Sequence, residues 1–526
     1  MGIGSAFMDW KGRYEPDLKE MQKYLGHIFD AYRKAVHRPN RVNDDESLDS
    51  SMDSFEVDIR NGNISGLSTL DHLLGILATE TTHFSEETYF AHMLSQSPKL
   101  LMLSHMIGII NSGNHVAAEV SRLSNNLERR IGRKIDDMVG YTTKSALSLV
   151  VSGGTEANMM ALLVARNTAY QEFDLRKNGG IGNEKINQKP AVILPASAHY
   201  SLDKSQNLLG LGEVNQVYVR VNDRCQMDLD DLQNKLMQVY KENRRIVAVV
   251  GIAGNTETGA IDDLRGINRI VRQFERETGK KVWLHADAAW GGPYIFMLDE
   301  FKEKFGKALK WYDSVSIDPH KNFYTPYNAG VISFKNGINA RRQLSTDAKY
   351  LKGHIKHPGG VKLIGSQSTS GIFSTYMALF AYPEEFYKEV FRTCLARTSY
   401  FVEQLKKVKL NSGRIEVVVE NPEMNLVNFR YIPAELDKPS SSKERALQKG
   451  ENTPYLSRVN RLNEAIGSYI NSEGRYTISD TSGLAKSGLY CHRVVLMNPL
   501  TKRENIDGFV EVYKKAIEHV MSQRRQ

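Results

Sequence analysis

Short apolar runs alternate with helical patterns through the middle of the chain, and each run ends in a polar cluster. The runs at 146–151, 191–195, 245–251 and 281–286 are mostly apolar and only five to seven residues long, as is typical of strands buried on both faces. The segments between them repeat apolar residues at helical spacing, most clearly over 264–274. Strand and helix in alternation predict an α/β domain with a mainly parallel sheet, whose ligands bind at the carboxyl ends of the strands.

The regions on either side of this alternation have other patterns. Residues up to about 65 are polar at their centre, and the following stretch to Tyr141 is mostly helical. Apolar residues at three- or four-residue steps predict one stripe on a long helix there: Val116, Val120, Leu123, Leu127 and Ile131. Beyond about Ala381 the order becomes helix, strand, strand, helix, with a Pro/Ser/Lys-rich exposed loop at 432–454.

These changes of pattern predict three parts. They are an N-terminal arm or helical segment (1–75), a large domain (76–380) and a smaller α+β C-terminal domain (381–526).

Composition narrows the class of protein. With 526 residues, 41% of them hydrophobic and 25% charged, the chain is expected to be a soluble globular protein of more than one domain. The net charge of +8 comes from basic residues interleaved with acidic ones, and no basic tract alternates with aromatic residues, so we expect no nucleic-acid partner. Three scattered cysteines, Cys225, Cys394 and Cys491, favour a reducing, cytoplasmic location.

No membrane segment is expected either. The most apolar window, 99–110, contains Ser104 and His105 and is too short to span a bilayer. The start of the sequence lacks a basic segment followed by a long apolar run, so we expect no export signal.

The first polar cluster, Ser152–Asn158, joins a predicted strand to a strong helix former. Gly153 and Gly154 allow the backbone to approach a ligand closely, and the N–H groups at the start of the helix together with the Thr155 hydroxyl can bind a phosphate. A tight turn capped by Thr155 is an equally good interpretation of this segment alone.

Two later clusters contain a lysine and a carboxylate at strand ends. Lys321 follows the short apolar strand that ends near Ile317, and a partly desolvated lysine amine can form a Schiff base with an aldehyde, as in enzymes that use pyridoxal 5'-phosphate (PLP). Asp287 follows the strand at 281–286, where an anion could keep the pyridine nitrogen of PLP protonated. Taken singly, Lys321 could be a surface lysine, Asp287 a helix cap, and His199, after another strand, a buried core histidine.

Together the clusters resemble the group II PLP-dependent amino-acid decarboxylases, over roughly residues 75–515. Five motifs in the family's order carry this resemblance: Ser152–Asn158 (SGGTEAN), Ala198–Tyr200 (AHY), Gly254–Asp262 (GNTETGAID), His285–Gly292 (HADAAWGG) and Ser316–Lys321 (SIDPHK). Trp290 and the Asp318–Lys321 segment are more similar to the members that act on aspartate, glutamate or cysteine sulfinate than to the aromatic amino-acid members, which tend to have Tyr at the Trp290 position.

The resemblance implies a fold, a cofactor and a set of roles. The fold would be the PLP-dependent transferase fold type I, with a mainly parallel seven-stranded sheet in the large domain, and the enzyme would be a homodimer acting on a small amino acid. Lys321 would form the aldimine with PLP, and Asp287 would pair with the pyridine nitrogen. The remaining implied roles are His199 stacking on the ring, Thr256 near its 3-hydroxyl, and Gly154, Thr155 and His320 holding the phosphate.

One departure from the family concerns the proton donor. Related decarboxylases carry a tyrosine on a mobile loop after the lysine, whereas this chain has no tyrosine between Tyr350 and Tyr376. We predict that His354 protonates the substrate carbon, because Gly353 before it gives freedom to swing inward, with Tyr350 and His357 as alternatives. His354 and His357 have no third ligand nearby, so we expect no metal. Gln367 also departs from the pattern, standing where many relatives have arginine.

These departures leave several functions open. The leading hypothesis is α-decarboxylation of a small, acidic amino acid such as glutamate or aspartate. The missing loop tyrosine also allows a PLP-dependent carbon–carbon lyase or a decarboxylase that consumes oxygen. The sequence is compatible as well with an aromatic amino-acid decarboxylase, or with a cofactor-free scaffold whose site is inactive.

Overall fold

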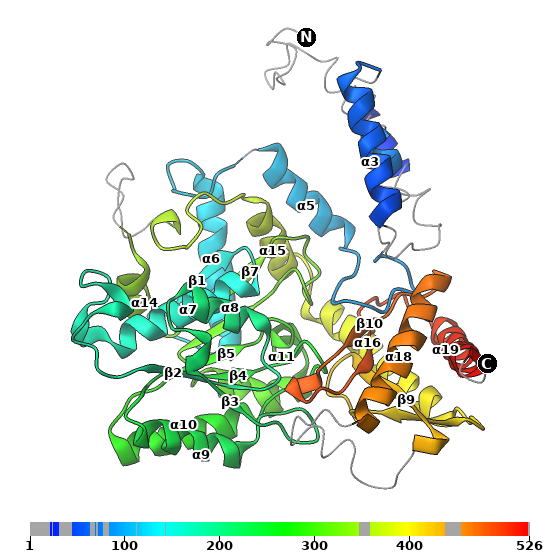
Figure 1. Cartoon of the computed structure of the whole chain (residues 1–526). Coiled ribbons are helices and arrows are strands. Elements are labelled where there is room, and N and C mark those ends of the chain that lie inside the picture. The colour runs from blue at the N-terminus through cyan, green and yellow to red at the C-terminus, as the bar shows by residue number, and fades with distance from the viewer. Residues whose placement is uncertain are drawn as a thin grey trace.

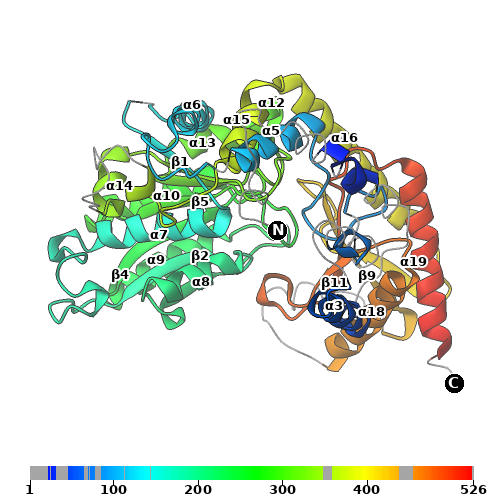
Figure 2. The same ribbon diagram turned by 90° about the horizontal axis from the view of Figure 1, so that it is seen from above.

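The chain folds into two lobes, each built on one β-sheet. The computed structural model describes residues 22–23, 25–30, 45–63, 69, 72–76, 84–111, 113–142, 144–346, 358–436 and 454–523. Helix α3 (Asp45–Arg60) projects away from both lobes (Figure 1), and the view from above shows the lobes side by side (Figure 2). None of the described helices is long and apolar enough to cross a membrane.

The larger lobe contains the predicted seven-stranded, mainly parallel sheet. In spatial order its strands are β1 (Leu147–Val151), β7 (Gly330–Phe334), β6 (Ser314–Ile317), β5 (Trp283–Asp287), β4 (Arg245–Ile252), β2 (Pro190–Pro195) and β3 (Gln216–Val219). Only β7 runs against its neighbours, pairing antiparallel with both β1 and β6. The fold class is therefore confirmed, including the parallel β2–β6 core that brings the polar clusters to one edge.

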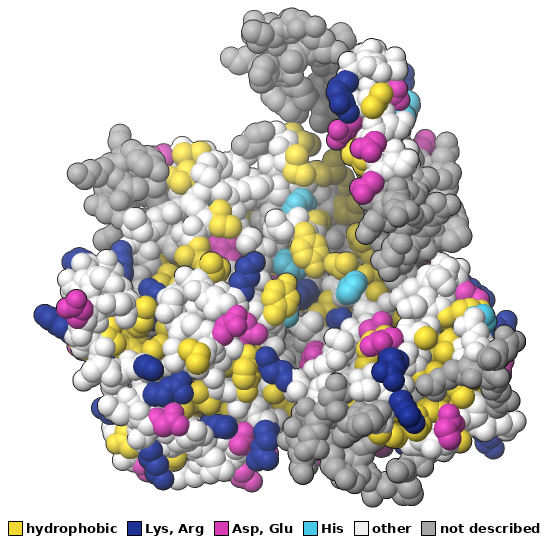
Figure 3. Space-filling view, in the orientation of Figure 1, with side chains coloured by type: hydrophobic (Ala, Val, Ile, Leu, Met, Phe, Trp, Pro, Cys, Tyr) yellow, Lys and Arg dark blue, Asp and Glu magenta, His cyan; other side chains and the backbone are white. Residues whose placement is uncertain are grey.

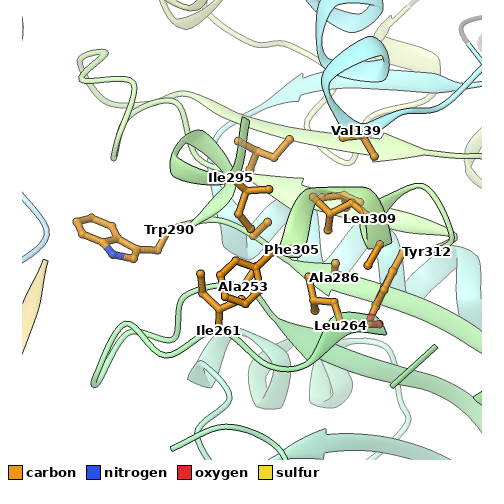
Figure 4. Packing of buried hydrophobic residues seen from close by; sticks show 14 of the residues in the cluster. Val139, Ala253, Ile261, Leu264, Ala286, Trp290, Ile295, Phe305, Leu309 and Tyr312 are labelled. Carbon is orange, nitrogen blue, oxygen red and sulfur yellow. The ribbon is translucent and has the colours of Figure 1, made fainter. Parts of the chain in front are cut away.

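Helices cover both faces of this sheet because its strands are apolar on both sides. Along β2, Ala191 and Ile193 pack in the cluster that contains α9 (Leu229–Lys241) and α10 (Leu264–Thr278). The intervening residues of β2 pack instead against α7 (Gly154–Ala169) and α8 (Tyr200–Leu208). Figure 4 shows the first cluster, where side chains from α10, β5 and the segment before β6 interlock. Burial of each such side chain contributes roughly 1.5–3 kcal/mol, so the strands are held in place from both sides.

The smaller lobe is an antiparallel sheet covered by long helices. Its strand order is β10 (Ser479–Thr481), β11 (Cys491–Val495), β9 (Leu426–Pro433) and β8 (Gly413–Val417). The helices are α16 (Glu384–Lys407), α18 (Pro454–Glu473) and α19 (Arg503–Gln523). Phe90, far away in sequence, packs edge-on against Phe509 in this core. The predicted domain boundaries at residues 75 and 380 stay a prediction.

One local prediction is wrong. The apolar stripe starting at Val116 was expected on a single long helix, but α6 (Arg122–Val139) begins only at Arg122. Ile131 is buried in the core, whereas Val120 and Leu123 are more than half exposed. The prediction failed because Val116 and Val120 lie in the irregular segment before the helix. Outside a helix, the spacing of apolar residues does not indicate which side chains share a face. Most of the predicted exposed loop at 432–454 lies outside the described residues.

Helix α6 is joined to the sheet by a buried carboxylate. Asp136 accepts hydrogen bonds from the hydroxyl groups of Ser148 on β1 (2.7 Å) and Ser333 on β7 (3.0 Å). Burial raises the pKa of Asp136 from 3.8 to about 6, because two neutral donors do not replace the water that a carboxylate loses. The charge of Asp136 therefore destabilises the folded protein at neutral pH.

We expect Asp136→Asn to stabilise the protein in a pH-dependent way. The asparagine carbonyl can still accept from both serines. The wild type loses folding stability as Asp136 ionises between about pH 4 and pH 6, whereas the variant has no charge to bury and keeps that stability. The gain should be roughly 2–3 kcal/mol at pH 8 and about half that at pH 5. Urea denaturation at both pH values measures it, with Asp223→Asn, at an exposed position that does not act on Asp136, as control. An equal gain at both pH values would show that burial of the charge is not the cause.

Candidate active site

A cavity of about 460 Å³ lies at the carboxyl ends of β4, β5 and β6. Seven of the predicted site residues line it: Gly154, Thr155, His199, Thr256, Asp287, His320 and Lys321. Figure 3 shows histidine side chains gathered in the hollow at the middle of the molecule's face. The eighth predicted site residue, His354, falls in 347–357, outside the described residues, so its role stays a prediction.

The glycine turn between β1 and α7 leaves the start of the helix open to a ligand. Gly153 is the N-cap residue and no side chain caps the helix, so the interpretation of Thr155 as a cap is wrong. Ser152 uses its N–H and hydroxyl to bind Glu156, both at 2.8 Å. A Cβ at Gly153 would lie 2.9 Å from Cε1 of His320, and one at Gly154 would lie 2.9 Å from Oδ2 of Asp318. Glycine is thus favoured at both positions on packing grounds, and the start of α7 borders the cavity, where its N–H groups can bind a phosphate.

Lys321 enters the cavity beside a buried carboxylate. Its Nζ lies 3.0 Å from Oδ2 of Asp318, and its side chain is 18% exposed. Asp318 is buried, and Lys321 and His320 hold the pKa of its carboxyl at about 2 even though burial alone would raise it. Its other oxygen, Oδ1, has no hydrogen-bond partner among the described residues. The lysine is therefore held by one ion pair at the wall of the cavity, where its amine can meet a bound aldehyde.

His320 and His199 occupy different walls of the cavity. The Nδ1 of His320 accepts from the Ala329 N–H at 3.1 Å, and its ring stacks on Tyr327 with centroids 4.1 Å apart. The Nδ1 of His199 accepts from the Ser201 N–H at 3.2 Å and so caps α8. Burial lowers the pKa of His199, which favours the neutral imidazole, a flat face suited to an aromatic ligand.

Asp287, at the end of β5, is only 6% exposed and is held by three donors. Its Oδ2 accepts from the Asn158 amide at 2.9 Å, and its Oδ1 accepts from the Ala289 N–H at 3.1 Å and the Ser316 hydroxyl at 3.2 Å. A carboxylate fixed in this way can bind a protonated ring nitrogen without moving. Asn158 and Ser316 were not predicted as site residues, although both lie inside quoted motifs. Only the folded arrangement shows that their side chains turn toward Asp287.

These features together fit PLP. The helix N-terminus without a side-chain cap suits the phosphate of PLP, and the buried carboxylate of Asp287 suits the pyridine nitrogen. Lys321, which is paired with one oxygen of Asp318 while the other oxygen has no partner among the described residues, suits the aldehyde.

Comparison with known proteins gives the same picture. The family model for the pyridoxal-dependent decarboxylase conserved domain matches residues 51–432. The chain is 27% identical to the aspartate 1-decarboxylase of Aliivibrio fischeri over 508 residues, covering 92% of this chain and 88% of that protein. It is 30% identical over 289 residues to the L-tyrosine/L-aspartate decarboxylase of Methanocaldococcus jannaschii, covering 54% of this chain and 65% of that protein.

Solved structures share the fold at lower identity. Mouse CSAD superimposes with a TM-score of 0.78 at 18% identity, over 95% of this chain and 99% of the mouse chain. Oryza sativa TDC, solved with PLP and tryptamine, gives a TM-score of 0.78 at 18% identity, over 98% of this chain and all of the rice chain.

We predict that Lys321→Ala loses the covalent attachment of PLP but keeps noncovalent binding, because the phosphate and ring-nitrogen contacts remain. Borohydride reduction followed by peptide mass mapping should find the cofactor on the peptide that contains Lys321 in the wild type and on no peptide of the variant. Turnover should fall by several orders of magnitude. The exposed Lys304→Ala is the control. A labelled lysine elsewhere in the wild type, or near-normal turnover of Lys321→Ala, contradicts the assignment.

Proposed function

The chain belongs to the pyridoxal-dependent decarboxylase family, and from that premise we propose that it removes the α-carboxylate of a small acidic amino acid, with PLP bound at Lys321. The observation that carries this proposal is the placement of Lys321 and the fixed carboxylate of Asp287 in one cavity with an open helix N-terminus. The names of the relatives, aspartate 1-decarboxylase and L-tyrosine/L-aspartate decarboxylase, support aspartate as the first substrate to test.

Each cavity residue has a proposed task. Bound PLP supplies an electron-poor ring that accepts the electron pair left when carbon dioxide departs. Asp287 would keep a proton on the ring nitrogen, and Lys321 would hold the cofactor and move protons at Nζ. The N–H groups near Gly154 and Thr155 bind the phosphate, with His320 beside them, while the His199 ring and the Thr256 hydroxyl orient the ring.

An acidic substrate also needs a cation for its second carboxylate, and Arg493 on β11 is our candidate. Arg493 is 7% exposed; its Nη1 donates to the Ser479 hydroxyl at 3.2 Å, and its Nε has no partner among the described residues. Its charge interacts with Glu257, which directly follows Thr256, and together with burial it lowers the pKa of His92. A buried guanidinium whose Nε has no partner among the described residues, and whose charge interacts with the residue next to Thr256, suits a carboxylate ligand. Sequence reasoning missed it because Arg493 lies within an otherwise ordinary strand.

The final protonation of the substrate carbon is assigned to His354, as the sequence suggests, with Tyr350 and His357 as alternatives. The related decarboxylases have a tyrosine in this loop, and this chain does not. A reaction that consumes oxygen and yields an aldehyde is therefore the second candidate function. The amounts of amine, aldehyde and oxygen consumed separate the two outcomes directly.

We further propose that two copies of the chain associate through the face formed by α5 (Lys99–Ile110). This helix buries only Leu101, Ser104 and Gly108, while Leu103 (58%), Ile107 (52%) and Ile109 (61%) are largely exposed. A patch of this kind on one helix is expected to be covered by a partner.

The location we propose is the cytoplasm. All three cysteines are buried, and none forms a disulfide among the described residues, in keeping with a protein that is kept in reducing conditions.

We expect the purified enzyme to release carbon dioxide from L-aspartate or L-glutamate faster than from tyrosine, tryptophan or small neutral amino acids, with one amine formed per carbon dioxide and no oxygen uptake. Arg493→Met should raise KM for the acidic substrate by roughly 10- to 100-fold, since a charged hydrogen bond is lost, and Arg493→Lys should recover part of the loss. A preference for aromatic substrates, or an unchanged KM in Arg493→Met, contradicts the acidic-substrate assignment.

The association of two copies has its own test. The double variant Leu103→Glu, Ile107→Glu should sediment as a monomer at concentrations where the wild type is a dimer, because charges in an apolar interface must be desolvated. Ile338→Glu on α14 (Gly337–Leu344), at a position that is 79% exposed, is the matched control and should stay dimeric. A monomeric wild type, or a dimeric double variant, would contradict this interface.

A further inference from the structure

A chain of hydrogen bonds crosses the large sheet and ends on Asp287. Trp283, at the start of β5, donates its Nε1–H to Oγ of Ser314 at 2.9 Å. The same Oγ lies 2.9 Å from Nδ1 of His285, and Nε2 of His285 lies 3.0 Å from Oδ1 of Asn158. The amide of Asn158 then donates to Oδ2 of Asp287 at 2.9 Å. Five side chains from β5, β6 and α7 are thus linked in a single series.

The direction of every bond in this series is determined by its two ends. Asn158 must turn its NH₂ group toward the Asp287 carboxylate, so its carbonyl faces His285. A carbonyl only accepts, hence Nε2 of His285 carries the hydrogen. Trp283 only donates, so the Ser314 hydroxyl is free to donate onward to Nδ1 of His285. The whole chain donates toward Asp287, and each dipole in it stabilises a negative charge there.

The surroundings of the series make this order costly to disturb. Ser314 and His285 are fully buried and Asn158 is 1% exposed, so water does not replace a lost bond. Burial lowers the pKa of His285 to about 4, which keeps the ring neutral at physiological pH and leaves Nδ1 free to accept. Both hydrogens of the Asn158 NH₂ group are used, since one donates to Asp287 and the other to Ser201 at 3.0 Å. The Ser316 hydroxyl lies 2.9 Å from the Asn158 carbonyl oxygen and 3.2 Å from Oδ1 of Asp287, and its single hydrogen serves one of these two acceptors at a time.

We propose that Asn158 and His285 are positioning residues that keep the Asp287 carboxylate aimed at the ring nitrogen of the cofactor. The inference rests on the proposed role of Asp287. Without the Asn158 donor, the carboxylate would lose its hydrogen bond at Oδ2 and with it its fixed orientation, and the ring nitrogen would hold its proton less tightly. The His285 ring fixes the orientation of the Asn158 amide, because an amide turned the other way would set its carbonyl against the carboxylate.

The test measures the proton on the ring nitrogen directly, by solid-state ¹⁵N NMR of the holoenzyme loaded with PLP labelled at that atom. Asn158→Leu should shift the signal toward the unprotonated value and lower kcat roughly 10- to 100-fold, with KM changing less than about threefold. Asn167→Leu, which removes another buried amide from the same helix, is the control and should leave the ¹⁵N signal unchanged. An unchanged signal in Asn158→Leu overturns the proposal.

A second set of measurements tests the direction of the series and does not depend on the Asn158→Leu variant. ¹⁵N NMR of histidine-labelled protein should find His285 neutral with its hydrogen on Nε2, and the Nδ1–H form would overturn the proposed order. His285→Gln, whose amide can still donate to Asn158, should keep more of the ring-nitrogen proton than His285→Phe, and equal signals from the two would count against the proposal.

Asp287→Asn separates this proposal from the proposed function. If that variant leaves the ring-nitrogen signal unchanged, the role of Asp287 itself is wrong, and the positioning role is overturned with it. If Asp287→Asn shifts the signal but the Asn158 and His285 variants do not, only the positioning role is overturned.

Discussion

The structure depends on holding two carboxylates in place where water is largely excluded. Asp287 and Asp318 are 6% and 1% exposed, at the ends of adjacent strands. Desolvation of a carboxylate raises its pKa strongly unless donors or cations compensate. The two residues have different neighbours: Asp318 lies beside Lys321 and His320, whereas Asp287 faces neutral donors from Asn158, Ser316 and the backbone. This difference leaves Asp287 free to pair with a cationic ring nitrogen.

The fold supplies these partners because parallel strands end at one edge. Strands β4, β5 and β6 bring their polar clusters to the same side, and α7 begins there with its N-terminus uncapped. The smaller lobe is fastened next to this edge: Glu257, beside Thr256, accepts from the Thr481 hydroxyl at 3.0 Å and the Ala485 N–H at 2.8 Å. The loop that contains Thr256 is therefore held by both lobes, which keeps this wall of the cavity in place.

Much of the fold and most of the candidate site could be predicted from the sequence, because the buried strands are marked by uninterrupted apolar runs and each ends in a motif. Residues such as Lys321 and Gly154 were placed by those motifs. What could not be predicted depends on side-chain direction. The donor order through His285 and Asn158, the exposure of Leu123, and the partly unpaired guanidinium of Arg493 follow from contacts between elements far apart in sequence. Strand β7 was missed because its antiparallel direction interrupts the alternation on which the prediction relied.

The most direct test of the account is a crystal structure of the protein with PLP and a non-reactive analogue of aspartate. The account predicts continuous density between the cofactor and either Lys321 or the analogue, the ring nitrogen within hydrogen-bonding distance of the Asp287 carboxylate, and the phosphate at the N-terminus of α7. A cofactor bound in another cavity, or one whose ring nitrogen faces away from Asp287, would contradict it.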